Sequence, residues 1–306
     1  MKLDKNENTQ FAAVDVGGTN TRFALFDKEG KIICKYKTAT DSMVAENTIN
    51  WVIDKIKEHK IKYLALCIPG PSDYENGVVL KSPNLLGSWE NFDVKKYILK
   101  NVELNDIVFE NDANVMALSN HNAYNCRDSD ISQFFTISTG FGAGLVIEGK
   151  IYHGNKYYAQ EIAQIPLSIK PFTGKHRLKN SFALELHCSG SGLETQAKAL
   201  GIAQSTKELL EKYNEGDEKA TELIDNAIET LARMFCVSAA TVAPTNFFVG
   251  GSVALNAEWM VLKAFEKAQE YADPNHFRNV NLYFDTNGDD SALQGLYYLI
   301  KQRNFG

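Results

Sequence analysis

Three glycine clusters, each directly after a short apolar run, most restrict what this 306-residue chain can fold into. The apolar runs are Phe11–Val16, Phe134–Ser138 and Phe247–Val249, and each has the length and composition of a buried β-strand. The clusters that follow them are Gly17-Gly18-Thr19-Asn20, Gly140-Phe141-Gly142-Ala143-Gly144 and Gly250-Gly251-Ser252. Because glycine permits tight turns, the pattern predicts strands that end in close backbone turns in both halves of the chain.

Two of the clusters also join one strand to the next. After the first cluster, Phe23–Phe26 resumes the strand pattern and Lys31–Tyr36 follows a polar turn, which predicts an opening β-meander. After the second cluster, Leu145–Ile147 is again strand-like. The strand, glycine hairpin, strand arrangement therefore recurs as a weak repeat of architecture rather than of sequence.

Helical periodicity supplies the other elements. Apolar residues at helical spacing predict a helix over Asn47–Lys60, between the meander and further strands at Tyr63–Ile68 and Ile107–Phe109. This strand, helix, strand order predicts a parallel crossover. A longer periodic segment predicts a helix over Ala220–Phe235, ending before a proline, and Ser291–Lys301 predicts a terminal helix.

Between these elements, Val115–Ser119 is expected to be a short helix and the polar stretch His121–Ser132 a surface excursion. A chain of 306 residues exceeds the usual size of a single hydrophobic core, so two domains are expected. We predict an α/β fold with a small domain at residues 1–119, completed by the terminal helix at 291–306, and a large domain at 120–290. A cleft between the two domains is expected to hold the site.

Composition excludes several classes of function. The net charge is −6 and the 32 Lys and Arg residues are scattered among 38 Asp and Glu residues, so no basic surface for nucleic acid is expected. Five cysteines without a CxxC pair fit a reducing compartment, and cytoplasmic localisation is expected. The polar segment Met1–Gln10 and the absence of a run of ~20 apolar residues predict neither secretion nor membrane insertion.

The glycine clusters leave two interpretations open. Consecutive backbone amides in a glycine turn can form a nest for phosphate oxygens, but each cluster is also an ordinary hairpin turn. Neither G-x-x-x-x-G-K-[ST] nor a G-x-G-x-x-G after a strand occurs, which argues against P-loop and dinucleotide-binding chemistry.

Acidic side chains at strand ends are likewise open to two interpretations. Asp15 ends an apolar strand, so its carboxylate must cap the turn or meet a charge partner such as hydrated Mg²⁺. Asn111 or Asp112 stands where a strand passes into a helix and is typical of an N-cap, with catalysis as the alternative. Glu161, and Glu194 after the expected Ser189–Gly192 turn, have the groups that a polyhydroxylated ligand requires.

The ordered set of motifs resembles the ROK family, which contains repressors, open reading frames and kinases. The motifs are Val14-Asp15-Val16-Gly17-Gly18-Thr19-Asn20-Thr21-Arg22, Glu110-Asn111-Asp112-Ala113-Asn114, Ser138-Thr139-Gly140-Phe141-Gly142-Ala143-Gly144, Gly149-Lys150-Ile151-Tyr152-His153-Gly154 and Gly250-Gly251-Ser252. The resemblance runs from about Phe11 to the terminal helix and implies the two-domain actin-like ATPase fold, which is ribonuclease H-like.

The resemblance implies an ATP-dependent hexokinase that uses Mg²⁺. It implies a first phosphate hairpin, in which Asp15 acts on Mg²⁺ directly or through water, a second hairpin, and an adenosine site. The residues implied for these three are Asp15, Gly17, Gly18, Thr19 and Asn20; Thr139, Gly140, Gly142 and Ala143; and Gly250 and Gly251. Asp112 would be the general base for the attacking sugar hydroxyl. Positions implied to lie at the sugar are Gly70, Asn84, Asn111, Glu161, Gln164 and Glu194.

Two motifs depart from the family pattern. Most relatives carry Glu-x-Gly-His and a cysteine-rich stretch whose His and three Cys bind a structural zinc. Here the His position is Gln164, and the cysteine positions hold Glu185, His187 and Gly192. Because a tetrahedral zinc site needs four nitrogen or sulfur ligands, we expect no zinc at this site, and we expect His187 and Cys188 to be ordinary loop residues.

The function implied is phosphoryl transfer from ATP to the 6-hydroxyl of a hexose, as in a glucokinase. An N-acetylmannosamine kinase, or a kinase of another hexose such as allose or fructose, is the alternative within the family. A non-catalytic sugar-binding or sensing protein is the alternative of another class. The family's repressors carry an N-terminal helix-turn-helix, for which the start of the first motif at Phe11 is expected to leave no room. By analogy with relatives, a homodimer is expected.

Overall fold

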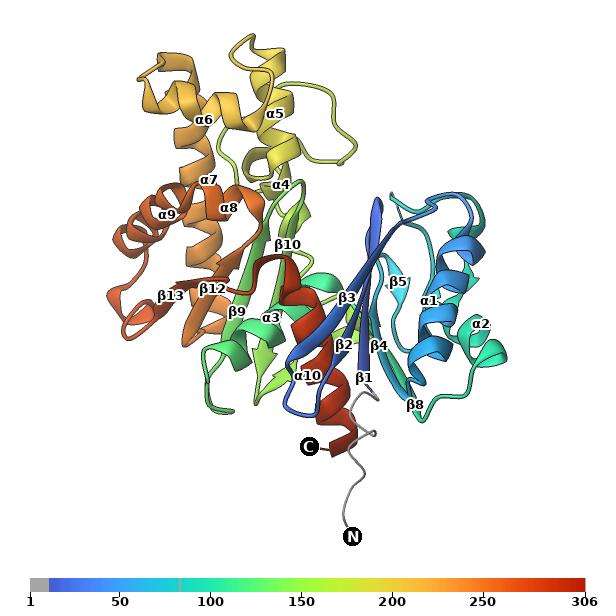
Figure 1. Ribbon diagram of the computed structural model, residues 1–306. Helices are drawn as coiled ribbons and strands as arrows, with labels where there is room; N and C mark the ends of the chain where they lie inside the picture. The colour runs from blue at the N-terminus through green and yellow to red at the C-terminus, as the bar shows by residue number, and fades with distance from the viewer. Residues whose placement is uncertain (1–10, 83, 306) are drawn as a thin grey trace. The chain divides into compact units, whose positions relative to one another are not determined.

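The computed structural model describes residues 11–82 and 84–305, so the segment Met1–Gln10 lies outside the described residues. The chain divides into two compact units, Met1–Asn125 with Asp289–Gly306, and Cys126–Gly288 (Figure 1). This division lies a few residues from the expected boundaries at 119/120 and 290/291, because the helix after Asp112 continues to Ala123. No helix among the described residues is long and apolar enough to cross a membrane.

The first unit is built on a sheet with strand order β3-β2-β1-β4-β8. Strands β1 (Phe11–Val16), β2 (Asn20–Phe26) and β3 (Ile32–Ala39) are consecutive and antiparallel, which confirms the predicted meander. Strands β4 (Tyr63–Cys67) and β8 (Asp106–Glu110) continue the sheet parallel to β1, which confirms the predicted crossover. The ends of β1, β4 and β8 therefore meet at one edge of the sheet.

Helices cover both faces of this sheet. Figure 1 shows α1 (Ala45–His59) and α2 (Val94–Asn101) on one side, and α3 (Asp112–Ala123) and α10 (Ser291–Phe305) on the other. Helices α3 and α10 approach so closely that a Cβ on Gly295 would lie 1.8 Å from the Val115 carbonyl oxygen. A small sheet, β5-β6-β7, and a 3-10 turn, η1, complete the described part of the unit: Ser72–Asp73, Val78–Val79, Phe92–Asp93 and Gly87–Trp89.

The second unit contains a sheet with strand order β11-β10-β9-β12-β13. Strands β9 (Ser132–Ile137) and β10 (Phe141–Ile147) form an antiparallel hairpin, and β12 (Asn246–Gly250) runs parallel to β9. The edge strands are β11 (Lys150–Ile151) and β13 (Asn281–Phe284). A glycine hairpin beside a parallel strand thus occurs in both units, as the weak repeat predicted.

The remaining helices surround the second sheet. They are α4 (Leu184–Cys188), α5 (Gly190–Ala199), α6 (Thr206–Asn214), α7 (Glu218–Val242), α8 (Ser252–Asn256) and α9 (Glu258–Tyr271), with 3-10 turns η2 (Asn155–Tyr157), η3 (Ile162–Gln164) and η4 (Pro274–His276). The 3-10 turn η5 (Gly288–Asp290) contains the chain boundary between the two units. The predicted helix at 220–235 is confirmed within α7, which ends at Val242 with Ala243 as its C-cap, before Pro244. Apolar side chains of α7 and α9 pack with β9 and β12, and Phe135 stacks on Phe247.

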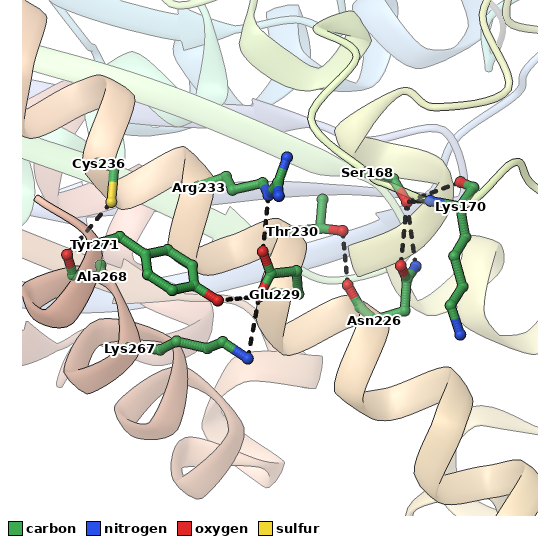
Figure 2. Close-up of polar contacts among 10 residues, drawn as sticks. All are labelled: Ser168, Lys170, Asn226, Glu229, Thr230, Arg233, Cys236, Lys267, Ala268 and Tyr271. Carbon is green, nitrogen blue, oxygen red and sulfur yellow. Dashed lines mark hydrogen bonds and ion pairs between the residues drawn. The ribbon is translucent and has the colours of Figure 1, made fainter.

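The long helix α7 is joined to α9 by one charged cluster (Figure 2). Tyr271 donates its hydroxyl hydrogen to Glu229 at 2.5 Å, and Arg233 and Lys267 donate to the same carboxylate at 2.8 and 3.0 Å. Burial alone would raise the pKa of Glu229, but these three hydrogen bonds outweigh it and lower the pKa to about 2. Glu229 is therefore ionised and paired at neutral pH.

One sequence prediction is right only in part, and another is wrong. Residues 124–131 of the expected surface excursion connect α3 to β9 and, except for Asp130, are half-buried or exposed, but the predicted stretch His121–Ser132 begins inside α3 at a buried His121 and ends at the first residue of β9. The expected turn at Ser189–Gly192 is the start of α5, in which the Ser189 side chain caps the helix by accepting from the Gly192 N–H. In both places polar residues form the end of a helix, α3 in the first case and α5 in the second, and the sequence analysis interpreted them as loop residues.

Candidate functional site

The first glycine hairpin lies at the end of β1. The Gly17 N–H donates to the Asn20 carbonyl at 3.0 Å, which closes the turn. A Cβ on Gly18 would lie only 2.8 Å from the Asn84 Cβ, so glycine is needed for the loop that carries Asn84 to approach the hairpin. The structure thus places Gly18, which the resemblance implied for phosphate binding, beside Asn84, which it implied for sugar binding.

Asp15 is placed by strand register between two partners. It lies opposite Cys67 on β4 and Arg22 on β2. The Cys67 thiol donates to Asp15 Oδ1 at 3.2 Å, and Arg22 Nη1 lies 4.0 Å from Oδ2. Desolvation, followed by repulsion from Asp112, raises the pKa of Asp15, while the Cys67 hydrogen bond and Arg22 oppose the rise.

Asp112 is the first residue of α3, and Asn111 is its N-cap. The Asn111 side chain accepts from the Ala113 N–H at 2.9 Å, which confirms the capping interpretation for that residue. Asp112 stays solvent-accessible, yet partial desolvation by the surrounding protein raises its pKa, against a hydrogen bond from the Ala113 N–H. A carboxylate with a raised pKa at the end of a strand is suited to accepting a proton.

Gly70 and Asn111 meet through a residue that the sequence analysis missed. Tyr74 is buried, and its hydroxyl oxygen lies 3.3 Å from Asn111 Nδ2 and 2.8 Å from where a Gly70 Cβ would stand. No motif marks Tyr74, because the segment that holds it has no periodicity. Tyr74 therefore contacts and supports Asn111, the residue next to Asp112.

The second hairpin is fastened to the junction of α4 and α5. Gly190 N–H donates to the Ser138 carbonyl at 2.7 Å, and Ser191 donates through its N–H and its hydroxyl to the Thr139 carbonyl at 3.1 and 2.6 Å. Glu185 accepts from the Phe141 N–H at 3.0 Å. The implied phosphate residues Thr139, Gly140, Gly142 and Ala143 lie in or directly after this turn.

The third glycine cluster packs against the strand that leads into the second hairpin. Gly250 pairs with Thr136 on β9. Gly251 has a φ of +91°, and a Cβ there would lie 2.5 Å from the Ile137 carbonyl oxygen, so only glycine fits without strain. Two of the three clusters therefore lie together in the second unit.

The remaining implied sugar residues also belong to the second unit. Glu161 precedes η3, and Gln164 ends it, with both side chains exposed. Glu194 lies on α5 and forms an ion pair with Lys198 at 2.5 Å, so it is a helical residue and not the loop residue that was expected.

The structure shows what surrounds His187, one of the positions that the family resemblance implied for a zinc ligand. His187 and Cys188 are buried in α4, so the loop interpretation is wrong. His187 Nε2 lies 2.9 Å from the Ser181 carbonyl oxygen and Nδ1 lies 3.1 Å from Asn226 Nδ2, which fits a neutral imidazole, and desolvation lowers its pKa. No group of three or more His, Cys, Asp or Glu among the described residues is placed to hold a metal.

The donor set at the first hairpin fits Mg²⁺ bound together with phosphates. Mg²⁺ in such sites takes one or two carboxylates and completes its octahedron with water and phosphate oxygens. Asp15 offers one accessible carboxylate, and the mutual repulsion of Asp15 and Asp112 is of the kind that a divalent cation relieves.

Two α/β units, each with a glycine hairpin between antiparallel strands beside a parallel strand, define the two-domain actin-like ATPase fold. Within that class the chain belongs to the ROK family, whose model matches residues 11–303.

Three curated relatives illustrate the family. The N-acetyl-D-glucosamine kinase of Vibrio atlanticus is 26% identical over 78% of this chain and 83% of its own length. The glucokinase of Halalkalibacterium halodurans is 24% identical over 96% and 95%, and the N-acetylmannosamine kinase of Escherichia coli is 28% identical over 85% and 89%.

Solved structures agree on the fold. The ROK hexokinase from Thermus thermophilus superposes with a TM-score of 0.79 at 25% identity, covering 95% of this chain and 99% of that one. A ROK family transcriptional regulator, described as a homolog of the E. coli MLC protein, superposes with a TM-score of 0.81 at 20% identity, covering 97% and 78%.

Proposed function

We propose that this protein is an ATP-dependent sugar kinase that transfers the γ-phosphoryl group of ATP to the 6-hydroxyl of a hexose. The observation that carries the proposal is the pair Asp15 and Asp112, both with raised pKa. Asp15 is near the end of β1 and Asp112 follows β8, two strands that flank β4 at one edge of the sheet, next to a glycine hairpin and the capped start of α3. The three curated relatives reported above are named as sugar kinases.

In the proposed reaction Asp112 is the general base. Its carboxylate accepts the proton of the attacking hydroxyl as the new oxygen–phosphorus bond forms and the bond from the γ-phosphorus to ADP breaks. Asn111 caps α3 and Tyr74 contacts the Asn111 amide, so both hold the start of the helix that carries the base. Asn84, Gly70, Glu161, Gln164 and Glu194 are the proposed contacts of the sugar.

The glycine hairpins are proposed to hold the nucleotide. Backbone amides of Gly17, Gly18, Thr19 and Asn20, and of Thr139, Gly140, Gly142 and Ala143, would donate to phosphate oxygens, with Gly250 and Gly251 at the adenosine. Mg²⁺, when bound beside Asp15, supplies positive charge to the β- and γ-phosphate oxygens. The chain's own contribution is alignment and donor geometry.

The hexose is to be identified by assay. Purified protein with Mg-ATP is tested on glucose, mannose, allose, fructose, N-acetylglucosamine and N-acetylmannosamine, with ADP release as the readout. We expect phosphorylation of at least one of them, with glucose first in order of expectation and N-acetylmannosamine second. No turnover of any sugar would overturn the kinase proposal.

Two observations favour a second candidate, a non-catalytic sugar-binding or sensing protein. Gln164 stands where most relatives have a His, and one structural neighbour is described as a transcriptional regulator. Calorimetry that detects sugar binding without ADP release would support this candidate. We further propose a cytoplasmic homodimer, and a light-scattering mass of one chain would contradict the dimer.

A further inference from the structure

The second glycine hairpin is in contact with a carboxylate from outside its own sheet. Glu185 is half-buried on α4, and its Oε2 accepts from the Phe141 N–H at 3.0 Å. A Cβ on Gly140 would lie 3.2 Å from the same oxygen, so the carboxylate lies directly against the turn. Strand pairing alone therefore does not fix this hairpin.

Three more hydrogen bonds join the same corner of α4 and α5 to the hairpin. Gly190 donates to the Ser138 carbonyl, and Ser191 donates twice to the Thr139 carbonyl. Both carbonyls are on the entering side of the turn, whereas Glu185 holds the leaving side. One short segment, residues 185–191, therefore forms hydrogen bonds with both sides of the turn between Ser138 and Phe141.

That segment is itself anchored away from the hairpin. His187, two residues after Glu185, contacts Asn226 of α7 at 3.1 Å and the Ser181 carbonyl at 2.9 Å. Asn226 in turn donates to the Ser168 hydroxyl at 3.2 Å, and Figure 2 shows this contact beside α7. The chain of contacts runs from Phe141 through α4 to the longest helix of the unit.

Resting on the proposed kinase function, we propose that Glu185 is a positioning residue for nucleotide phosphates. Its carboxylate fixes the Phe141 amide, and so orients the amides of Thr139 and Gly140 toward the phosphates. The hydrogen bond from the Phe141 amide to Glu185 attaches the leaving side of the turn to α4 and so sets the direction of that amide. A negative charge so close to phosphates is otherwise unfavourable, so its benefit is in the geometry.

The proposal is tested by two substitutions at one position. Glu185→Ala removes both the acceptor and the charge, whereas Glu185→Gln keeps an acceptor oxygen and removes the charge. We expect Glu185→Ala to weaken binding of ADP about tenfold by calorimetry and to raise KM for ATP similarly, with KM for the sugar within about twofold. Glu185→Gln should restore both values to within about threefold of the parent protein.

Amide hydrogen exchange measures the contact without any catalysis. In Glu185→Ala the amides of residues 139–142 should exchange at least tenfold faster, and in Glu185→Gln they should remain protected. Glu211→Ala is the matched control, because Glu211 is an exposed helical residue of the same unit whose nearest cation, Lys207, is 3.8 Å away. It should change none of the readouts.

The outcomes separate the two proposals. If the parent protein binds ADP but phosphorylates no sugar, the kinase function fails while the ADP affinities still test Glu185. If Glu185→Ala binds ADP as tightly as the parent protein, the positioning role is overturned. If Glu185→Gln is as weak as Glu185→Ala, the charge and not the hydrogen bond matters, which also overturns it.

Discussion

The two glycine hairpins have the same local architecture but different surroundings. The hairpin of the first unit is flanked by titratable groups of its own sheet, with Asp15 between Cys67 and Arg22 by strand register. The hairpin of the second unit receives its carboxylate, Glu185, from a helix, and its Ser138 and Thr139 carbonyls accept hydrogen bonds from Gly190 and Ser191. The same hairpin motif is therefore surrounded by charged side chains of its own sheet in the first unit, whereas in the second unit it is held by hydrogen bonds to a neighbouring helical segment.

The charges of the two units differ in what they do. In the first unit, Asp15 and Asp112 lie at strand ends with raised pKa, so their ionisation at neutral pH costs stability. In the second unit, Glu229 is paired on α7, far along the chain from the hairpin, and its pKa of about 2 means that ionisation adds stability. Desolvated carboxylates with raised pKa mark the proposed catalytic region, and a carboxylate whose pKa is lowered by three hydrogen bonds marks a structural one.

The largest expected effect is on the charged site. Asp112→Asn keeps the size of the side chain but cannot accept the proton, so kcat should fall roughly 10²–10⁴-fold. In the parent protein the acidic limb of kcat against pH should lie above the ordinary range of an aspartate, because the pKa of Asp112 is raised and activity is lost as pH falls through it.

The control for this change is Asp54→Asn, an exposed aspartate on α1 of the same unit. It should leave kcat and its pH profile unchanged. An Asp112→Asn protein that retains kcat within a few-fold would remove Asp112 from the reaction and with it the distinction drawn between the hairpins.

The next effect concerns the helix that carries the base. Gly295→Ala would place a Cβ 1.8 Å from the Val115 carbonyl oxygen, so α3 and α10 must move apart. Overpacking of this kind costs about 1–3 kcal/mol, and we expect the upper end, measured by urea unfolding. Hydrogen exchange should place the loss in the first unit.

Gly201→Ala is the comparison variant, because that glycine has open space around it and a φ of +68°. It should cost about 1 kcal/mol from backbone strain alone. Equal losses in the two variants would mean that the α3–α10 contact is not as tight as the structure has it.

The sequence predicted those features whose signal is local. The glycine turns and the apolar strands gave the two sheets, and strict helical spacing found most of α7. Helices α2, α4, α5, α6, α8 and α9 were missed. For α4 and α5 the reason is that glycine, serine and polar residues at 185–192 resemble a turn, and α9 has no side-chain cap. The Glu185, His187 and Asn226 contacts join segments far apart in the chain, so no local pattern could indicate them.

A moderate effect is expected from the charged cluster of the second unit. Glu229→Gln removes a carboxylate that accepts from Tyr271, Arg233 and Lys267 and should lower the free energy of unfolding at pH 7 by roughly 2–3 kcal/mol. Because the folded pKa is depressed, this stability is present above the unfolded value near 4.5 and is lost as pH falls toward 2.

Hydrogen exchange measured separately for each unit between pH 5 and 2.5 compares the effect of Glu229 on stability with that of Asp15 and Asp112. The second unit should lose stability on acidification in the parent protein and much less in Glu229→Gln, while protonation of Asp15 and Asp112 opposes such a loss in the first unit. Glu218→Gln, an exposed position on the same helix, is the control. An unchanged pH slope in Glu229→Gln would contradict the low pKa.

The smallest expected effect is that of a chelator. The four positions that the family resemblance implied for zinc hold Gln164, Glu185, His187 and Gly192, and the imidazole among them contacts Asn226 and the Ser181 carbonyl through its two nitrogens. A neutral imidazole with both nitrogens in hydrogen bonds has no lone pair left for a metal. The melting temperature should therefore stay within about 1 °C in EDTA, since the corner of α4 and α5 gets its rigidity from packing and hydrogen bonds. A drop of many degrees with release of stoichiometric zinc would show instead that a metal holds this corner, and that the second hairpin, like the first, depends on bound charge.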